Sequence, residues 1–481
     1  GEPIAGASVY IKGTSRGAST DLNGRFIIEI DATTDSLVVT SVGYKAKTIA
    51  VGNAREMTVT LELDLEQQKI EEIVIVGFGK QKKITTVGAQ SSVNAEELKM
   101  PVANLTNLIA GRVAGIIGVQ RSGEPGFDNS EIYIRGISTF TSSSPLVLVD
   151  GIERAFNNVD PEDIENFTIL KDASATAVYG VRGANGVILI QTKKGRSGKT
   201  NINAQIDYGV TQFTRLPRLA DGVTYLKVSN EAYRNSNPSD PLPRYSQERI
   251  DATANGTDPD LAPDVNWFDV IFNKHGDNRR VRVNANGGSE KAQYYLSVGY
   301  YDETGMFKTD QLAQYNSAIR FTRYNFTSNL TLHLTKTTKV DFGASGWISN
   351  GNYPGSSTGS IFNAAYVMPP ITIPVRYSNG YFSQPRTGDM ANPYTLLTQT
   401  GYSTRFNSQL WSNIRVRQDF DFITEGLSVT AMYSFDNSNG HYISRNKSVD
   451  SYLATGKNED GSINFMQTSI GTNYLGYNRE N

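Results

Sequence analysis

Three short runs of this sequence carry the letters of catalytic or nucleotide-binding motifs. GSSTG (355–359) has the spacing of a hydrolase nucleophile, but we place it in a polar loop, and only His441 follows it as a possible base. GFGKQKK (77–83) and GRSGKT (195–200) each lack one of the glycines that dinucleotide-binding and phosphate-binding loops require. None of the three runs therefore predicts catalysis.

Side chains that bind metals are sparse. The 481 residues include no cysteine and three histidines, His275, His333 and His441, which are far apart in the sequence. No H-E-x-x-H run and no zinc-type Cys/His spacing occurs. The acid pair at 162–163 stands at an expected helix start, where carboxylates complement the helix dipole without acid–base chemistry. We expect no enzyme, no metal site and no cofactor.

Two cations are candidates for a structural role. Arg135, in the run EIYIRG, and Lys171, in the run FTILKD, each end an apolar strand. A charge that becomes buried there needs a partner of opposite sign, so we expect carboxylates that face inward from a surrounding wall. The alternative is a solvated cation at a strand end.

The elements that would form such a wall begin after Gly195. Alternating apolar and polar residues predict strands at 202–210, 281–287, 294–301, 324–334, 339–348, 406–420 and 427–435. Tight connections (287–291, 335–339, 422–427) alternate with longer ones (211–278, 302–315, 349–404, 436–462). Strands of about 9–11 residues with one apolar face, and short turns at one rim only, are typical of a transmembrane β-barrel. A spanning helix would need about 18 consecutive apolar residues, and no such run occurs.

The rest of the chain divides into three expected parts. Residues 1–63 predict a small β-sandwich with strands at 7–12, 25–30, 37–44, 47–51 and 57–63. Residues 64–83 form a linker. Residues 84–195 predict an α+β unit, with helical turns at 95–113, a helix start at Asp160-Pro161, a short helix at 172–180 and strands at 167–171 and 186–192. Residues 196–481 then hold about eight strands of the wall.

Several of these runs resemble one known family. EIYIRGIST, PLVLVDGI and DPEDIENFTILKDASATAVYGVRGANGVILIQTKKG occur in order between Glu131 and Gly195. They resemble the plug signature of the SusC/RagA family of TonB-dependent outer-membrane transporters. GEPIAGASVYIKGTSRGASTDLNGRFIIEI resembles the carboxypeptidase-regulatory-like domain that often precedes such plugs. The resemblance implies an α+β plug within a transmembrane antiparallel β-barrel, preceded by a β-sandwich on the periplasmic side of the bacterial outer membrane.

The same resemblance implies that the chain is an N-terminal fragment of such a transporter. Plugged transporter barrels have about 22 strands, so the chain would carry roughly the first third of the wall. The first domain usually starts with one more strand, before the turn Gly1-Glu2-Pro3. We therefore expect both ends to be cut.

A short apolar run in the linker resembles the TonB box of this family. The matching residues are Glu71, Glu72, Ile73, Val74, Ile75, Val76 and Gly77. An isolated extended segment can add as a strand to the edge of a partner's sheet. The resemblance implies that the periplasmic C-terminal domain of TonB grips this segment; the alternative is an ordinary first strand of the plug. Arg135 and Lys171 resemble the family's plug–barrel latch residues, although the family more often has arginine where Lys171 stands.

The function implied is the TonB-dependent import of a nutrient, an oligosaccharide or a peptide, beneath a SusD-like surface lipoprotein. Outer-membrane lipid would surround the wall, and the residues that bind the substrate stay unassigned. The balance of 46 basic and 48 acidic residues gives no reason to expect nucleic acid. The alternatives are a surface receptor or adhesin that binds or senses a ligand without transporting it and, more weakly, a carboxypeptidase-like enzyme.

Overall fold

The computed structural model divides the chain into two compact units, Gly1–Val87 and Gly88–Asn481. It describes residues 3–480 except for 5, 13, 15, 31–35, 42–43, 53–55, 63–72, 77–78, 83–89, 95–103, 137–142, 241, 311–313 and 387–389. No helix among the described residues is long and apolar enough to cross a membrane.

The first unit is built on a four-stranded antiparallel sheet with the order β2-β1-β3-β4. The strands are β1 (Ser8–Ile11), β2 (Gly17–Ser19), β3 (Ser36–Thr40) and β4 (Lys47–Ala50). Alternate residues of β1 and β3 face the core, and Phe26, Ile28 and Ile30 pack against it together, as the alternation predicts. The sequence predicts strands at 25–30 and 57–63, but residues 25–30 and 57–62 belong to no strand, and residue 63 lies outside the described residues.

The described residues between 90 and 195, hereafter the plug, form a small α/β body within the second unit. A five-stranded sheet has the order β11-β10-β13-β12-β7, in which β10 and β13 are parallel and the other neighbours antiparallel. Strands β8 and β9 pair separately. The bounds are β7 (Gln90–Asn94), α1 (Leu105–Ile109), β8 (Ile116–Gln120), β9 (Ser130–Ile134), β10 (Leu146–Val149), β11 (Ile152–Glu153), β12 (Ile164–Leu170) and β13 (Val187–Thr192).

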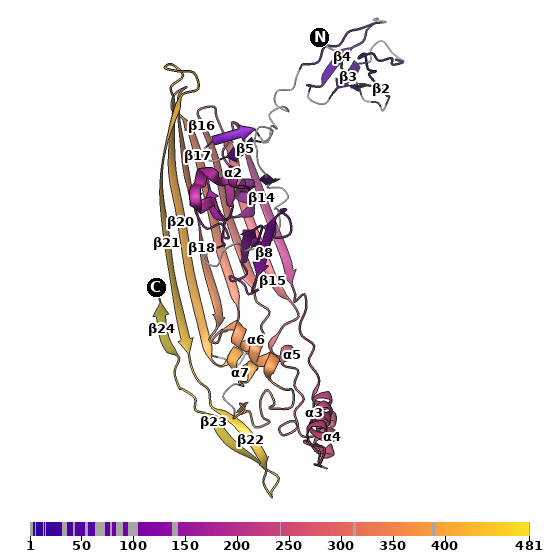
Figure 1. The fold of residues 1–481 in the computed structure, drawn as a ribbon, viewed down its shortest axis with the longest axis vertical. Coiled ribbons are helices and arrows are strands. Elements are labelled where there is room, and N and C mark those ends of the chain that lie inside the picture. Colours follow the sequence, from indigo (N-terminus) through magenta and orange to yellow (C-terminus); the bar gives the residue numbers. More distant parts are fainter. Residues whose placement is uncertain are drawn as a thin grey trace. The chain divides into compact units, whose positions relative to one another are not determined.

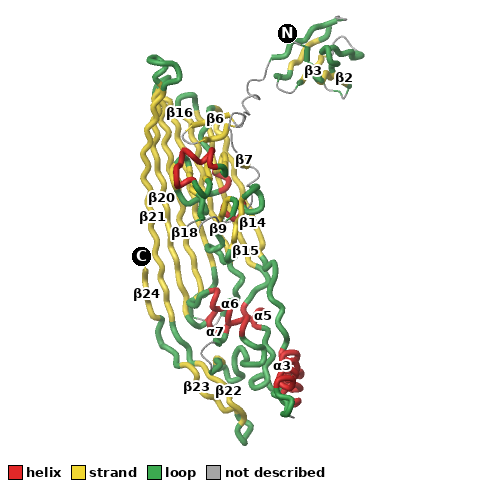
Figure 2. The backbone as a smooth tube through the Cα atoms, in the orientation of Figure 1, coloured by secondary structure: helices red, strands yellow, loops and turns green. Residues whose placement is uncertain are grey.

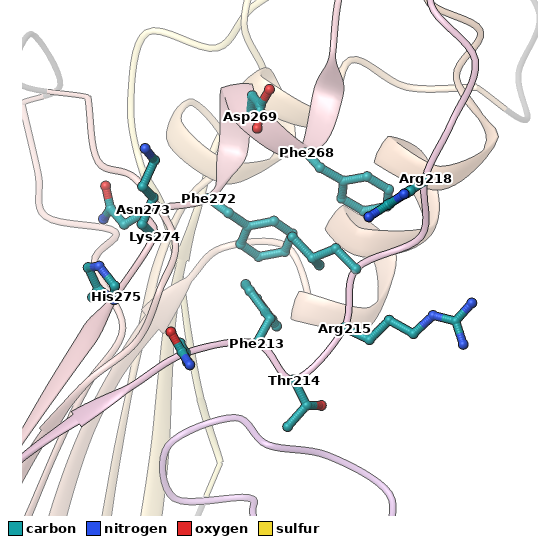
Figure 3. A pocket seen from close by; sticks show the side chains of 12 residues that line it. Phe213, Thr214, Arg215, Arg218, Phe268, Asp269, Phe272, Asn273, Lys274 and His275 are labelled. Carbon is teal, nitrogen blue, oxygen red and sulfur yellow. The ribbon is translucent and has the colours of Figure 1, made fainter.

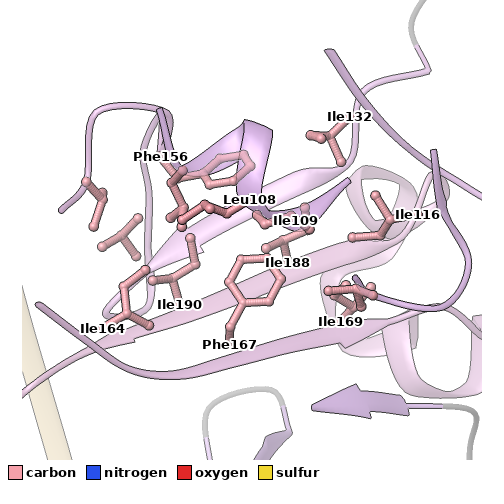
Figure 4. Close-up of a cluster of buried hydrophobic side chains, with 14 of the residues drawn as sticks. Leu108, Ile109, Ile116, Ile132, Phe156, Ile164, Phe167, Ile169, Ile188 and Ile190 are labelled. Carbon is pink, nitrogen blue, oxygen red and sulfur yellow. The ribbon is translucent and has the colours of Figure 1, made fainter. Parts of the chain in front are cut away.

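The plug has an apolar core of its own. Phe167 of β12, Ile188 and Ile190 of β13, and Leu108 and Ile109 of α1 lie in one buried cluster (Figure 4). Burying side chains of this size contributes about 1.5–3 kcal/mol each. The plug can therefore hold its own shape while other contacts attach it to its surroundings.

The helices of the plug are shorter than the sequence predicts. Helix α1 is the described helical part of 95–113. The helix expected from Asp160-Pro161 is a single 3₁₀ turn, η3 (Pro161–Asp163), because Ile164 is already extended and opens β12. The helix expected at 172–180 is α2 (Ala173–Thr176) followed by a 3₁₀ segment, η4 (Ala177–Gly183), which is interrupted at Gly180 where φ is +57°.

An eight-stranded antiparallel sheet forms most of the second unit, and we call it the wall. Its order is β14-β15-β16-β17-β18-β20-β21-β24. The bounds are β14 (Gly198–Thr211), β15 (Gly276–Gly288), β16 (Ala292–Thr304), β17 (Arg320–His333), β18 (Thr338–Pro354), β20 (Gly401–Asp419), β21 (Ser428–Asn446) and β24 (Gly476–Glu480). The predicted alternation of tight and long connections is confirmed, and α3, α5, α6 and α7 lie beyond one end of the strands (Figure 2).

Several strands of the wall are longer than predicted. β18 has 17 residues, and β20 and β21 have 19 each, against an expectation of about ten. In β21 the apolar alternation stops at Phe435, but backbone pairing with β20 continues to Asn446. Alternation marks the part of a strand that has one apolar face, whereas the hydrogen-bond ladder depends only on the backbone. The sequence therefore could not predict where these strands end.

Along β15 and β16 the wall buries its polar face and exposes its apolar face. On β15, Val281 and Val283 are 41% and 46% exposed, while Arg282 between them is 3% exposed. On β16, Leu296 is 46% exposed and Tyr295 is 1% exposed. This is the reverse of a soluble sheet and matches a wall with lipid outside and a polar interior. The plug lies against the polar face (Figure 1).

The long connections fold into a second apolar core. They contain α3 (Gly222–Ser236), α4 (Gln247–Asn255), α5 (Trp267–Ile271), α6 (Thr358–Val367), α7 (Pro393–Thr398), and a small sheet of β19 (Phe382–Ser383), β22 (Ser451–Lys457) and β23 (Ile463–Ser469). Trp267 and Ile271 of one loop and Ile361 and Leu397 of another are at most 1% exposed. These loops thus present preformed surfaces.

Candidate functional site

A buried cluster of charges joins the plug to the wall. Arg280 Nη2 lies 2.5 Å from Asp160 Oδ1, at the start of the turn before β12. Arg282 lies 2.7 Å from Asp163 Oδ1 and 3.0 Å from Glu162 Oε2. Every side chain in the cluster is at most 12% exposed. We call these five residues, three carboxylates of the plug and two arginines of β15, the clasp.

Asp163 is the carboxylate of the clasp that contacts three strands of the wall. In addition to Arg282 on β15, its Oδ1 accepts a hydrogen bond from the Tyr295 hydroxyl on β16 at 2.8 Å. Its Oδ2 accepts one from the Thr327 hydroxyl on β17 at 2.7 Å. A buried carboxylate is tolerated only when a counter-charge and hydrogen bonds satisfy it. Asp163 therefore ties the plug to three adjacent strands at once.

The clasp has the reverse of the charge arrangement expected from the sequence, although Arg154 of the plug and Asp436 of the wall do pair in the expected sense. The expectation is cations on the plug and carboxylates on the wall, with Glu162 and Asp163 serving only a helix dipole. In the structure these carboxylates pair with arginines of the wall. The alternation in VRVNANG (281–287) places residue 282 on the polar face, and residue 280, two positions earlier, would share that face because side chains two apart point the same way. Two arginines two positions apart on a polar face therefore indicate a binding site for carboxylates of the plug.

The predicted latch cations bind partners within the plug. Arg135 Nη2 lies 2.5 Å from Asp172 Oδ1, and the Arg135 side chain is 56% exposed. The Lys171 ammonium donates to the backbone carbonyl of Ala114. Partial burial, together with the nearby Arg135 charge, lowers the pKa of Lys171. The role of Arg135 and Lys171 as a latch between plug and wall stays a prediction.

A second ion pair attaches the plug to the later strands of the wall. Arg154, which follows β11, donates to both carboxylate oxygens of Asp436 on β21, at 2.9 and 2.5 Å. Its guanidinium is 5.4 Å from the ring centroid of Trp411, and its side chain is 2% exposed. Nearby, Arg415 Nη2 donates to the carbonyl of Asp150 at 2.8 Å. The plug is thus fixed to β20 and β21 as well as to β15–β17.

The loop between β8 and β9 meets the long connections of the wall. Glu124 Oε2 accepts a hydrogen bond from the hydroxyl of Thr358, the first residue of α6, at 2.6 Å. The Tyr353 hydroxyl donates to the carbonyl of Pro125 at 3.0 Å. Burial raises the pKa of Glu124 above its ordinary value. The plug is therefore in direct contact with the folded loops.

The predicted TonB box is described only at its centre. Ile73–Val76 form β5, while Glu71, Glu72 and Gly77 lie outside the described residues. The segment is extended as expected but not isolated, since it pairs antiparallel with β6 (Gly79–Lys82). Along its other edge, β5 has no partner among the described strands. A two-stranded hairpin is marginally stable in water, so β5 can exchange β6 for another strand at little cost.

The run GSSTG (355–359) does not lie in a polar loop, as the sequence predicts. It lies where β18 passes into α6, because β18 is longer than predicted. Ser357 Oγ accepts a hydrogen bond from the backbone N–H of Ser360 at 3.1 Å and so caps α6. His441 stacks on Phe406 with centroids 5.0 Å apart. No group of three or more His, Asp or Glu within the described part of the chain could hold a metal ion. The Ser357 hydroxyl is a helix cap.

Acid should weaken the clasp only well below neutral pH. Burial alone would raise the pKa of Asp160, but Arg280 and Arg282 oppose this more strongly and hold that pKa below its ordinary value. A carboxylate with a depressed pKa contributes stability above its unfolded pKa, about 3.9, and loses it as pH falls through the folded pKa. We expect the difference in the free energy of unfolding between the wild type and Asp160→Asn to be constant above about pH 5 and to shrink below about pH 4. Urea titrations of detergent-solubilised protein measure it; a difference that vanishes between pH 6 and 8 would contradict the ion pairing.

Comparisons with known proteins agree with this architecture. The family pattern described as TonB-dependent Receptor Plug Domain matches residues 82–187, and that of the CarboxypepD_reg-like domain matches residues 1–75. TonB-dependent receptor P26 of Formosa agariphila is 34% identical over 351 residues, which cover 71% of this chain and 33% of that protein. TonB-dependent receptor SusC of Bacteroides thetaiotaomicron is 31% identical over 394 residues, 79% of this chain and 35% of that protein.

Solved structures give the same picture. The RagAB peptide importer in its "open-open" state has a chain with 25% identity and a TM-score of 0.63, over 78% of this chain and 43% of that chain. The RagAB peptide transporter has a chain with 26% identity and a TM-score of 0.60, over 75% of this chain and 42% of that chain. This chain spans about a third of the length of the two relatives, P26 and SusC.

Proposed function

This chain belongs to the SusC/RagA family of TonB-dependent receptors, and we propose that it takes part in the active import of a nutrient across the bacterial outer membrane. The wall would be part of a barrel in outer-membrane lipid, and the plug would close its lumen. The observation that carries the proposal is the inverted wall, with the plug attached to its buried polar face through Arg280, Arg282 and Arg154. A lumen closed by a plug held in this way would need a source of energy to open.

The energy would come from TonB through the segment 71–77. In this proposal the periplasmic C-terminal domain of TonB takes β5 as an added strand, in place of β6. Tension along the chain then reaches β7, the edge strand of the plug sheet, which pairs with β12. A pull on an edge strand can break its hydrogen bonds one after another. Residues 1–63 would lie in the periplasm, joined by the linker 64–83 to the plug at 84–195 and the barrel at 196–481.

The long connections would face the cell exterior. Their preformed helices and the small sheet offer a surface for a SusD-like lipoprotein that closes over the mouth. The solved neighbours are described as a RagAB peptide importer, and the relative SusC is 31% identical over 79% of this chain. The proposed cargo of this chain is an oligosaccharide or a peptide.

Deleting residues 71–77 should abolish uptake of labelled nutrient and leave surface binding intact. A sharper version replaces Ile75 by proline, which removes a backbone donor from β5 and blocks strand addition. The matched control is Gln81→Pro, which disturbs β6 but leaves the donors of β5 in place. We expect background uptake for Ile75→Pro and retained uptake for Gln81→Pro. Uptake that persists in the deletion variant excludes the coupling role of residues 71–77. A wild-type protein that binds the nutrient but does not import it favours a receptor or adhesin.

A further inference from the structure

The outer face of the wall, which is the face that exposes Val281 and Leu296, changes its character from one end to the other. Next to the tight turns, one row of the ladder from β17 to β21 consists of Leu332, Val340, Val416 and Ala431. Next to the long connections, another row across the same strands consists of Arg320, Asn352, Thr404 and Ile443. An even number of positions separates the two rows on each strand, so both belong to the outer face. This face is therefore apolar at one end and largely polar at the other.

The long-loop end of the outer face carries arginines. Those at outer positions of the described strands are Arg279 on β15, Arg320 on β17, Arg445 on β21 and Arg479 on β24. At the same end, the carboxylates at outer positions of the described strands are Asp277 and Asp302. Asp302 Oδ1 lies 2.7 Å from Arg320 Nε, and Asp277 accepts a hydrogen bond from the Tyr208 hydroxyl at 2.7 Å. Positive charge therefore exceeds negative charge along this rim.

Aromatic rings accompany these cations. The Arg445 guanidinium lies 4.6 Å from the ring centroid of Tyr477. The ammonium of Lys447, directly after β21, lies 5.7 Å from the ring centroid of Tyr315, which stacks on Tyr402 at 5.8 Å. Aromatic rings and long basic side chains gather where the hydrocarbon region of a membrane meets the headgroups. The long-loop rim thus has the composition of a membrane interface.

A recess of about 350 Å³ lies on the outer face at the same level. Its polar lining at outer positions consists of Arg320, Thr322, Asn350, Asn352, Thr404 and His441. The next outward pair toward the tight turns is Tyr324 and Ile348, which are 50% and 42% exposed. The recess therefore lies at the boundary between the apolar and the polar part of the face, where it leaves room for a polar headgroup.

The folded loops begin directly beyond this rim. Phe213, just after β14, packs edge-on against Phe272, just before β15, with ring centroids 4.6 Å apart (Figure 3). Phe272 belongs to the buried core of the long connections. The arginines of the rim therefore lie between an apolar strand face and a loop body with a core of its own, which fixes their level on the wall.

We propose that these four arginines, which we call the rim belt, bind the phosphate-bearing headgroups of the lipid leaflet that surrounds the long-loop end of the wall. The inference rests on the membrane setting of the proposed function. Phosphate oxygens accept charge-assisted hydrogen bonds from the guanidinium groups, and the acyl chains lie against exposed apolar residues such as Val298 and Leu410. β17 and β21 are three strands apart, about 14 Å, so the belt contacts several lipids and no single headgroup has to reach every arginine.

Equilibrium binding of fluorescently labelled lipid A to the full chain in a nonionic detergent tests the proposal. The two probes are lipid A with its phosphates and the same lipid after the phosphates have been removed, so that only the headgroup charge differs. A basic side chain near an anionic lipid surface strengthens binding about fivefold, and we expect at least this preference for the phosphorylated form. The preference should shrink with added salt, because the contact is ionic. Equal binding of the two lipids overturns the proposal, and so does displacement of the lipid by inorganic phosphate, because the site would then be one for a free anion.

Variants locate the binding to the rim belt. Arg279→Gln combined with Arg445→Gln should weaken the binding of phosphorylated lipid about fivefold, while the dephosphorylated lipid binds as before and so reports that the variant is folded. Arg320 is kept, because it pairs with the Asp302 carboxylate, which is 6% exposed.

The matched control is Lys227→Gln combined with Arg234→Gln, which removes the same charge from exposed positions of α3 and should behave as the wild type. A phosphate preference that is equal in the rim-belt variant and the wild type refutes the assignment. Binding is measured without TonB and without nutrient, so a failure here leaves the uptake experiment unaffected, and the reverse also holds.

Discussion

Replacing Asp163 by alanine should destabilise the attachment of the plug by about 3–5 kcal/mol, the range measured when one partner of a buried ion pair is removed. The guanidinium of Arg282 is 3% exposed and would keep Glu162 as its remaining carboxylate. The hydroxyls of Tyr295 and Thr327 would both lose their acceptor inside the protein. Unsatisfied buried donors add to the cost of the unpaired charge.

Urea unfolding of detergent-solubilised protein, together with proteolysis of the plug, measures this loss. Glu165→Ala is the matched control, because Glu165 is two residues away and pairs with Arg196 at 3.3 Å on an exposed surface. An exposed pair of this kind contributes at most about 1 kcal/mol. The same loss in both variants would show that the clasp is no stronger than a surface ion pair.

The substitution Gly195→Ala should also strongly destabilise the folded protein. A Cβ built there would lie 2.1 Å from the backbone nitrogen of Tyr294 and 2.4 Å from the carbonyl carbon of Gln293. Both atoms belong to β16, which is held on either side by β15 and β17 and cannot easily move away. We expect Gly195→Ala to cost about 3 kcal/mol, at the upper end of the range for overpacking.

The yield of folded protein and the midpoint of urea unfolding measure that cost. Gly123→Ala is the control, since a Cβ at this glycine of the plug meets nothing within 4 Å. Its stability should stay within about 0.5 kcal/mol of the wild type, as for a typical surface substitution. An equal yield of folded protein for Gly195→Ala and Gly123→Ala would contradict this close contact between Gly195 and the backbone of β16.

Much of the fold could be predicted from local pattern. The alternation in YYLSVGYY placed Tyr295 and Leu296 on opposite faces, and the structure buries the first and exposes the second. The plug strands and their turns also follow from short apolar runs, as in PLVLVDG, where β10 ends before Asp150 and Gly151 with positive φ. These features depend on residues that are neighbours in the chain.

The clasp and the ion pair of Arg154 with Asp436 could not be predicted in the same way, because their partners are far apart in the sequence. Asp160 and Arg280 are separated by 120 positions, and Arg154 and Asp436 by 282. Local pattern says which face a side chain takes, but not which plug residue lies opposite it. That depends on how the plug is turned within the wall, which only the three-dimensional packing determines.

The clasp also bears on the order in which the protein can assemble. Its arginines and the two hydroxyl donors to Asp163 come from β15, β16 and β17, which precede β20 and β21 in the chain. Asp160 and Arg280 are 120 positions apart, whereas Arg154 and Asp436 are 282 positions apart. Contacts between segments near in sequence lose less chain entropy on forming than those that close longer loops. The plug can therefore dock on β15–β17 first, and the later strands of the wall can then pair beside a plug that is already in place.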